Sequence, residues 1–350
     1  MKERVTVFAA TGFTGRLVCA ELTRKGIPFA VAGRSRERLE ELRDATGAVD
    51  AVVADATRPE TLGALTEGGT RVLVNCAGPF LRYGMPVVEA AVAAGVHYLD
   101  TTGEQPFMKE VADRLDAPAR ERGCTVVNAM AFEYAVGDWT SEVAMLRSGM
   151  DSFDHVAVAY ALSGEGMSRG TALSIFEMLG RQAWGWEGGR WVRRFAGSMR
   201  REVAFPWGMR SCVWAPFGEV LYLARRGTVK TATTWMRLPT LAGLAAPWAN
   251  MAAWPVRPFV RPLGGVWARF VSPRPPTPEQ RRASRFCIVA GADGARAVAS
   301  GTDAYGLTAR IVALGVEKLL GGKAPAGVRS PATMGLDPRK SLKAVGVVVE

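Results

Sequence analysis

The stretch Val5–Arg16 constrains the fold of this chain more than any other part of the sequence. It opens as a β-branched, apolar run, which predicts a buried strand. It then turns through Gly12 and Gly15 into a helical pattern that stops at Gly26. A strand, a glycine turn and a helix N-terminus together form a cradle that favours a phosphate group. Ala9 stands where such a motif usually has its first glycine, so the spacing is Ala-x-x-Gly-x-x-Gly.

Short apolar strands alternate with helical segments through the first third of the chain. This alternation predicts βαβ units and a parallel sheet, with ligands bound at the carboxyl ends of the strands. We expect Ser35 to cap the second helix, Thr57 and Glu60 to form a capping box, and a further helix to span about 86–94. After the opening strand, the expected strands are residues 29–33, 51–54, 71–75, 97–100 and 125–128.

The end of the second expected strand identifies the nucleotide. An NAD site usually carries an acidic residue about 20 residues after the glycines, for the ribose hydroxyls. Here the sequence is Gly33-Arg34-Ser35-Arg36 instead. The planar fork of an arginine suits a 2′-phosphate, so we expect NADPH/NADP+ with Arg34 as the main contact. A solvated charge run that opens a helix is the alternative interpretation. Asp55, after the third strand, is either an acceptor for the adenine amino group or a polar loop residue.

The remaining cofactor candidates come from the loops that follow the strands of this sheet. Gly12 would let the backbone approach a pyrophosphate, and Gly15 would let the helix pack on the strand. The full predicted set is Ala10, Thr11, Gly12, Phe13, Thr14, Gly15, Arg34, Ser35, Asp55, Ala56, Cys76, Ala77, Gly78, Pro79, Phe80, Thr102 and Gly103.

Cysteine and histidine usage narrows the function classes. The five cysteines are scattered without a Cys-x-x-Cys motif, which favours free thiols in a reducing cytoplasm. With only His97 and His155, the chain has no multi-histidine metal site, and a Ser-His-Asp hydrolase is disfavoured. We therefore expect no metal. The first strand begins at once, so we expect a cytoplasmic protein without a signal peptide.

The second part of the chain has a different pattern. From about residue 131, long strand-like segments follow one another, which predicts a mostly antiparallel sheet. We expect strands at 155–162, 190–205, 213–223, 228–236, 285–290 and 295–301, and helices at 171–183 and 308–320. The predicted fold is thus α/β, with a Rossmann-type parallel sheet over 1–130 and a second α+β domain over 131–304 for substrate or dimerisation. Residues 305–350 are expected to return to the first domain.

The segment Leu238–Val256 carries no charged residue and lies between Arg237 and Arg257. Its length alone would suit a membrane span, but three prolines make one continuous spanning helix improbable. A helical hairpin in a membrane interface, a lid over an apolar substrate, and a buried dimer or domain interface all fit this composition. We expect a wall of the apolar substrate site that includes Trp248 and Trp254. The net charge of +11 favours an acidic carrier protein or an anionic membrane surface as partner, not nucleic acid, although an arginine-rich composition alone also explains it.

Several motifs together resemble the saccharopine dehydrogenase-like oxidoreductases, and within them the trans-acting enoyl reductases. The likeness covers nearly the whole chain. It rests on the segments Ala10–Arg16, Ala32–Arg34, Asn75–Phe80, His97–Glu104, Gly166–Thr171, Tyr305–Thr308 and Gly327–Pro331.

The resemblance implies an NADP-binding Rossmann domain and an α/β substrate domain. It also implies reduction of a carbon–carbon double bond in a lipid or polyketide intermediate. Such a step needs a proton source beside the cofactor. Tyr83 is the first candidate and Glu104 the second, although Tyr83 also suits simple packing. Ser168 and Thr171 either hold a polar group of the substrate or cap a helix. A non-catalytic NADP sensor and a membrane- or lipid-associated protein of the same fold stay open as alternatives.

Overall fold

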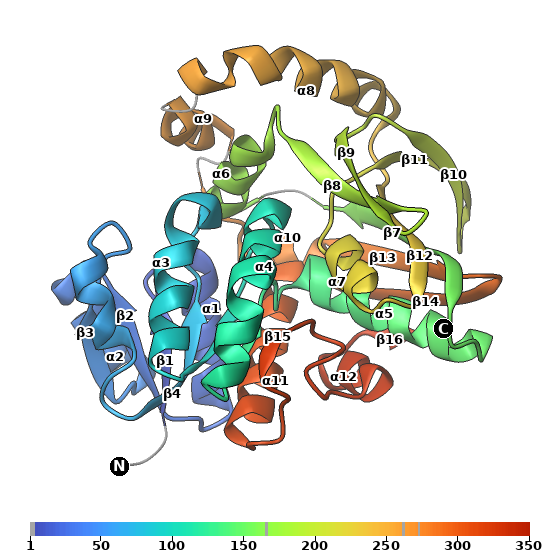
Figure 1. Ribbon diagram of the computed structural model, residues 1–350. Coiled ribbons are helices and arrows are strands. Elements are labelled where there is room, and N and C mark those ends of the chain that lie inside the picture. Colours follow the sequence, from blue (N-terminus) through green and yellow to red (C-terminus); the bar gives the residue numbers. More distant parts are fainter. Residues whose placement is uncertain (1–3, 165–166, 261–262, 272–273) are drawn as a thin grey trace. The chain divides into compact units, whose positions relative to one another are not determined.

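The computed structural model describes residues 4–164, 167–260, 263–271 and 274–350 (Figure 1). The chain divides into two compact units. The first comprises Met1–Ala135 and Tyr305–Asp337, and the second comprises Val136–Ala304 and Pro338–Glu350. The sequence placed the first boundary after residue 130 and assigned the whole of 305–350 to the nucleotide domain. Residues 338–350 instead group with the second unit, because Val348–Val349 pairs with a strand of the second sheet.

The first unit is built on a parallel sheet, as the alternating pattern predicts. Its strand order is β15-β6-β5-β4-β1-β2-β3, with Val7 of β1 paired to Val31 of β2 and Val74 of β4. The order reverses at β1, which places the end of β1 at the position where such sheets bind ligands. The strands are β1 (Arg4–Phe8), β2 (Phe29–Gly33), β3 (Asp50–Val53), β4 (Thr70–Asn75), β5 (His97–Asp100), β6 (Thr125–Val127) and β15 (Gly327–Arg329).

Helices cover this sheet, and local chemistry sets their ends. Ser35 Oγ accepts the Arg38 N–H, and Gly47 in the left-handed region ends the second helix, as predicted. The predicted capping box at Thr57 and Glu60 is wrong, because Thr57 bonds the Asp55 carboxylate instead. The helical segments are α1 (Phe13–Arg24), α2 (Arg36–Thr46), the 3₁₀ turn η1 (Pro59–Leu65), α3 (Phe80–Ala93), α4 (Gln105–Glu121) and α11 (Ala304–Leu320).

The helix α3 begins six residues before the predicted start at Pro86. Proline is tolerated in a helix only where its missing N–H and its ring can be accommodated.

The core on this side of the sheet holds α3 against α4, where Phe107 lies on Gly84. A Cβ on Gly84 would come within 2.6 Å of the Phe107 ring, so glycine is required for this close approach.

The second unit has a mostly antiparallel sheet, as predicted. Its order is β10-β11-β12-β7-β13-β14-β16, and its one parallel pair along this path, over the described residues, is β12 with β7. The hairpin β8–β9 is attached through β12. The strands are β7 (Phe153–Ser163), β8 (Gln182–Glu187), β9 (Arg190–Phe195), β10 (Arg200–Phe205), β11 (Gly208–Trp214), β12 (Val229–Met236), β13 (Arg285–Ala292), β14 (Ala295–Thr302) and β16 (Val348–Val349).

Three expectations for this unit are wrong in part. The segment 190–205 is two strands, because a turn at Gly197 separates them. The strand expected over 213–223 ends at Trp214, and the helix α7 follows. The helix expected over 171–183 ends at Met178, because β8 begins at Gln182. The helices are α5 (Phe132–Ser148), which spans the boundary between the units, α6 (Arg169–Met178), α7 (Glu219–Arg225), α8 (Thr240–Val260), α9 (Gly264–Val271), α10 (Pro278–Ala283) and α12 (Pro338–Ala344).

The uncharged segment forms the continuous helix α8, which runs through Pro247 and Pro255. Both prolines are thus accommodated within one helix, whereas the sequence predicted that they make one continuous membrane-spanning helix improbable. A proline at position 247 cannot donate to the carbonyl of Gly243, four residues before it. Arg200 Nη2 donates to that oxygen at 3.2 Å and satisfies it. Among the described residues, no helix has both the length and the apolar character that crossing a membrane requires.

Candidate functional site

The cradle between β1 and α1 is shaped by close backbone contacts. A Cβ on Gly15 would come within 2.4 Å of Ala9 O and 2.8 Å of Ala10 Cα, so this position admits only glycine. Gly12 is extended and exposed, and its N–H donates to Ala9 O at 3.0 Å. Ala9 has a φ of 56°, in the left-handed region that favours glycine. This explains why related motifs have glycine at that position.

The cradle fits a dinucleotide phosphate. The N–H groups of the first helical turn, at Phe13, Thr14 and Gly15, have no partner within the helix, and the turn contains no acidic residue. The helix N-terminus therefore offers donors and positive potential to an anion. Arg16 is exposed, and its Nε donates to Thr11 O at 3.1 Å, which holds a guanidinium beside the turn. Arg16 was not among the predicted cofactor residues, although it follows the last glycine directly.

Two arginines lie at the adjoining strand ends. Arg34 follows β2 and Arg58 lies in the loop after β3, and both are exposed. Over the described residues, neither side chain has a carboxylate within ion-pair distance. Both act on Asp55, whose pKa lies below its usual value because of hydrogen bonds from Thr57 first and then the charges of Arg34 and Arg58. This loop pair can bind a phosphate monoester through two guanidinium groups.

Asp55 is already partly engaged. Its Oδ1 accepts from the N–H and the hydroxyl of Thr57, both at 2.9 Å. The other carboxylate oxygen of Asp55 would be the acceptor for an adenine amino group. The predicted contact between Asp55 and adenine remains untested. Ala56 next to it is partly exposed.

Glu104 lies where the sequence places it, after β5, but its geometry is that of a helix cap. Its side chain is buried, Oε1 accepts the Phe80 N–H at 2.9 Å, and Oε2 accepts the Leu81 N–H at 2.8 Å. A carboxylate at the N-terminus of α3 satisfies two backbone donors and faces the positive end of the helix dipole. This arrangement favours a capping role for Glu104 over proton donation.

A buried polar network joins the ends of β4, β5 and β6. Asp100 accepts from Ala129 N at 2.8 Å, Thr102 N at 3.1 Å and Asn128 Nδ2 at 2.7 Å. Asn75 Nδ2 donates to the Tyr98 hydroxyl at 3.0 Å. Burial outweighs the hydrogen bonds and raises the pKa of Asp100 to about 6.

This network was missed as part of the site. The sequence signal was a polar residue at the end of each of three neighbouring strands: Asn75, Asp100 and Asn128. Such residues meet at one edge of a parallel sheet. The network fixes the loop that holds the predicted cofactor residues Thr102 and Gly103. Within this loop, the Thr102 hydroxyl accepts the Glu104 N–H, and the Gly103 carbonyl accepts a hydrogen bond from the Tyr134 hydroxyl.

The loop after β4 holds the remaining candidates. Cys76 and Ala77 are half-buried, Gly78 is exposed, and Pro79 and Phe80 are buried at the start of α3. Burial raises the pKa of the Cys76 thiol to about 12, which keeps it protonated and unreactive. Tyr83 lies one turn further along α3 and is half-buried. Its role as proton donor remains a prediction.

The predicted substrate residues lie in the second unit. Ser168 is the N-cap of α6, and its Oγ accepts the Thr171 N–H at 3.1 Å and lies 3.0 Å from the Thr171 hydroxyl. This is the capping alternative of the sequence analysis. Trp248 and Trp254 lie on α8 with 71% and 62% of their surface exposed. Neither observation tests substrate binding.

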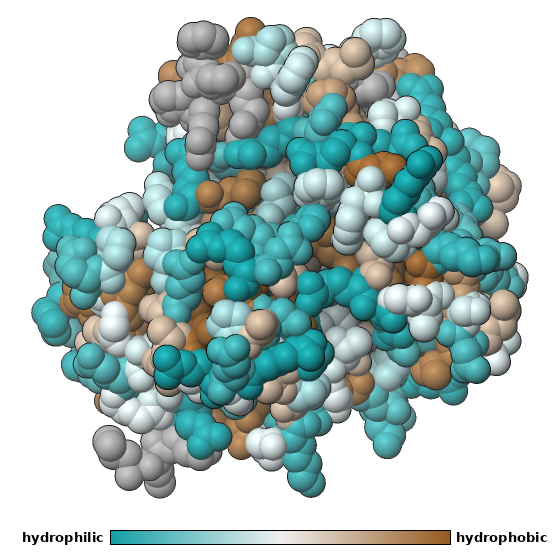
Figure 2. All heavy atoms as spheres, in the orientation of Figure 1, coloured by the Kyte–Doolittle hydropathy of each residue, from teal (hydrophilic) through white to brown (hydrophobic). Residues whose placement is uncertain are grey.

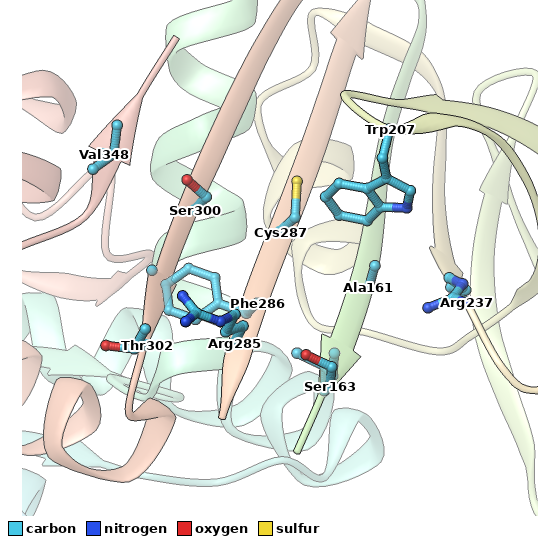
Figure 3. Close-up of a pocket in the computed structure, with 12 residues that line it drawn as sticks. Ala161, Ser163, Trp207, Arg237, Arg285, Phe286, Cys287, Ser300, Thr302 and Val348 are labelled. Carbon is cyan, nitrogen blue, oxygen red and sulfur yellow. The ribbon is translucent and has the colours of Figure 1, made fainter. Parts of the chain in front are cut away.

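The second unit also contains a cavity of about 530 Å³ on one face of its sheet (Figure 3). Ala161, Cys287 and Ser300 lie opposite one another on β7, β13 and β14, and the Trp207 side chain reaches toward the strand that carries Ala161. Arg285 also lines the cavity, as does Arg237 after β12. Small apolar side chains and two guanidinium groups can hold an apolar molecule with an anionic group. No local sequence pattern indicates this cavity, because its residues come from distant segments.

The parallel sheet, its order and the glycine cradle define a dinucleotide-binding domain of the Rossmann type. Residues 6–127 match the family described as the saccharopine dehydrogenase NADP binding domain. The prediction of an NADP cofactor is confirmed at this level, as is the resemblance to the saccharopine dehydrogenase-like proteins.

The chain is also similar to named mycobacterial proteins. It is 34% identical over 186 residues to a protein of Mycobacterium tuberculosis that is named among the trans-acting enoyl reductases, which covers 50% of this chain and 44% of that protein. It is 34% identical over 161 residues to the trans-acting enoyl reductase of Mycobacterium ulcerans, covering 44% and 38%. The chain thus matches less than half the length of these relatives.

A solved structure has a similar fold over the whole chain. Apo saccharopine dehydrogenase (L-Glu forming) from Saccharomyces cerevisiae superposes with a TM-score of 0.60 at 14% identity, covering 100% of this chain and 99% of that one. The fold class predicted from the sequence is therefore confirmed.

Proposed function

We propose that this protein is an NADPH-dependent reductase of a carbon–carbon double bond in an enoyl intermediate of lipid or polyketide synthesis. The cofactor part of the proposal is carried by Arg34 and Arg58, two arginines without a carboxylate partner among the described residues, at the strand ends where the adenosine ribose lies in such domains. The choice of an enoyl substrate rests on the similarity to the trans-acting enoyl reductases.

When bound, NADPH supplies the hydride, and the protein supplies binding, orientation and a proton. The N–H groups at the start of α1 and the Arg16 guanidinium would hold the diphosphate. Arg34 and Arg58 would hold the 2′-phosphate and so select NADPH over NADH. Glu104 and Asp100 would keep the loops after β4 and β5 in place through their hydrogen bonds to backbone N–H groups.

Reduction of an enoyl thioester also requires a proton at the carbon next to the carbonyl. Tyr83 is our proposed donor, because it lies in the first half of α3, directly after the loop of Cys76–Phe80. Glu104 is less suited, since both of its carboxylate oxygens already accept backbone hydrogen bonds.

The proposal is tested by NADPH oxidation with enoyl thioesters of short and long chains, presented on pantetheine and on an acyl carrier protein. We expect loss of the reduced nicotinamide absorbance together with formation of the saturated thioester by mass spectrometry. Tyr83→Phe should lower kcat by roughly 10²-fold or more, the scale of a lost general acid, with NADPH affinity unchanged.

Binding and turnover must be measured separately. A protein that binds NADPH tightly but turns over none of these thioesters would be an NADP sensor and would refute the proposed reaction. Turnover by Tyr83→Phe at the wild-type rate would refute only the role of Tyr83.

A further inference from the structure

The helices α8 and α9 of the second unit present large apolar side chains to solvent. Figure 1 shows α8 as the outermost element of this unit, next to α9 and α6. Three of the exposed side chains are aromatic: Trp248, Trp254 and Phe270 are 71%, 62% and 82% exposed. We call the whole set the α8–α9 surface. It comprises Leu244, Trp248, Met251, Trp254, Val256, Leu263, Val266, Phe270 and Val271.

The inner sides of both helices are fixed to the unit. Asn250 Oδ1 accepts the Gly180 N–H at 3.1 Å, and its Nδ2 donates to Ala196 O at 3.3 Å. In α9, the Trp267 ring lies 5.2 Å from that of Phe176 in α6. These contacts orient the helices so that Trp248 faces outward, whereas Trp254, one turn after Asn250, lies at the border of the exposed side with its ring 6.3 Å from that of Phe195. The exposure of the α8–α9 surface is therefore a property of the packed helices.

It is unusual for a helix as apolar as α8 to be so exposed to solvent. Between Leu241 and Val256 the only polar side chain is Asn250, and it is engaged inside the unit. A helix that is apolar all round is normally buried, and contiguous exposed apolar surface marks an interaction site. In Figure 2, brown atoms are scattered among pale ones at the top of the view.

The charge of the segment indicates which partner covers it. From Leu238 to Pro278 the sequence contains no Asp or Glu, whereas arginines occur at 257, 261, 269 and 274. Arg269 and Arg274 are exposed. Arginine and tryptophan beside a broad apolar surface are typical of helices that lie in the headgroup region of an anionic bilayer.

A protein partner fits less well. Protein interfaces contain about one hydrogen bond per 100–200 Å², and the exposed side chains of α8 that the structure describes between residues 242 and 256 offer only the indole N–H groups of Trp248 and Trp254. The acyl region of a bilayer needs none. No helix among the described residues is suited to crossing the membrane, so the helices would lie in its plane.

We propose that the α8–α9 surface binds the interface of an anionic lipid bilayer and holds the protein at a membrane surface. This goes beyond the proposed reaction, and its test does not depend on turnover. Flotation is measured with vesicles of phosphatidylcholine alone and of phosphatidylcholine with phosphatidylglycerol. We expect the protein to float with the anionic vesicles, and high salt to weaken this binding.

The decisive variant is the triple substitution Trp248→Ser, Trp254→Ser and Phe270→Ser. It should lower the apparent partition coefficient for anionic vesicles by at least ~tenfold, because three large apolar side chains no longer enter the lipid. The matched control is Leu146→Ser with Met150→Ser, two exposed apolar residues (56% and 48%) outside the α8–α9 surface. The control should bind like the wild type. Circular dichroism and NADPH affinity establish that both variants are folded.

Four results would overturn the proposal. One is no flotation with anionic vesicles, and another is an equal loss in the control variant. A third is self-association of the wild type that the triple substitution abolishes without any vesicle binding, which would identify a second copy as the occupant. The fourth is binding of an acyl carrier protein, instead of vesicles, that the triple substitution abolishes.

Discussion

The carboxylate of Glu104 caps α3 by accepting the N–H of Phe80 at 2.9 Å, across the ends of β4 and β5. Glu104→Gln keeps the shape of the side chain but loses its charge and one acceptor oxygen. We expect the free energy of unfolding to fall by about 1–2 kcal/mol, from the lost charge-assisted bond and the helix dipole. Urea denaturation measures this.

The same variant separates capping from catalysis. If Glu104 only positions the loops, the remaining kcat of Glu104→Gln should keep the wild-type pH profile. Loss of the alkaline limb of that profile, where a proton donor would ionise, with unchanged stability, would show that Glu104 is the proton donor instead.

Arg34 and Arg58 should both contribute to cofactor choice. Removal of the guanidinium in Arg34→Ala should weaken NADPH binding by roughly 1.5–3 kcal/mol, the scale of hydrogen bonds to a charged group, and should leave NADH binding nearly unchanged. Arg58→Ala should act in the same direction. Arg36→Ala is the matched control, because Arg36 pairs with Glu40 at 3.6 Å. Calorimetric titration measures the affinity of each variant for NADPH and for NADH. Equal losses of affinity for the two cofactors would exclude a contact with the 2′-phosphate.

The two glycines of the cradle should respond differently to substitution. Gly12→Val should leave the protein folded but abolish NADPH binding, because Gly12 is extended and exposed and its new side chain would occupy the approach of the pyrophosphate. Gly15→Ala should cost about 1–3 kcal/mol of stability through overpacking, since its Cβ would lie 2.4 Å from Ala9 O. Thermal unfolding and fluorescence titration distinguish the two. Normal NADPH affinity in a folded Gly12→Val variant would contradict this assignment.

Ala9 is a position where the natural residue is strained. Its φ of 56° costs an L-residue roughly 1–2 kcal/mol, which the greater freedom of glycine in the unfolded chain partly offsets. Ala9→Gly should therefore raise the free energy of unfolding by about 0.5–1 kcal/mol. Ala10→Gly, at a neighbouring position without a positive φ, should lower it by a similar amount. A lower free energy of unfolding in both variants would show that Ala9 is not strained.

The parallel sheet of the first unit could be predicted almost residue by residue, because its strands are short, apolar and separated by clear helix signals. The strand 29–33 and the cap at Ser35 are examples. The second unit was harder to predict. Val213–Leu223 has Glu219 as its one charged residue and is otherwise largely apolar, so periodicity could not separate β11 from α7.

The site was predicted where it depends on local sequence and missed where it depends on tertiary contacts. The glycine spacing and Arg34 are local features. The cap by Glu104 joins residues 24 positions apart in the sequence, and the partners of Asp100 include Ala129, 29 positions away. Arg200 bonds the carbonyl freed by Pro247 across 43 positions. Such pairs follow from the folded backbone, and no spacing rule in a single sequence indicates them.

Asp100 should make the stability of the protein depend on pH in an unusual direction. Burial raises its pKa from 3.8 to about 6, so the folded state holds this proton more tightly than the unfolded state does. Its contribution to stability is fully present below the unfolded pKa and is lost as the pH rises through the folded pKa. The free energy of unfolding should therefore fall between about pH 4 and pH 6, by on the order of 3 kcal/mol from this group. Urea denaturation across this range, with Asp100→Asn as reference, isolates the effect. The variant is destabilised overall but lacks this titration, so the difference between the two curves should change through the same window. A difference that is constant with pH would show that Asp100 titrates normally in the folded protein.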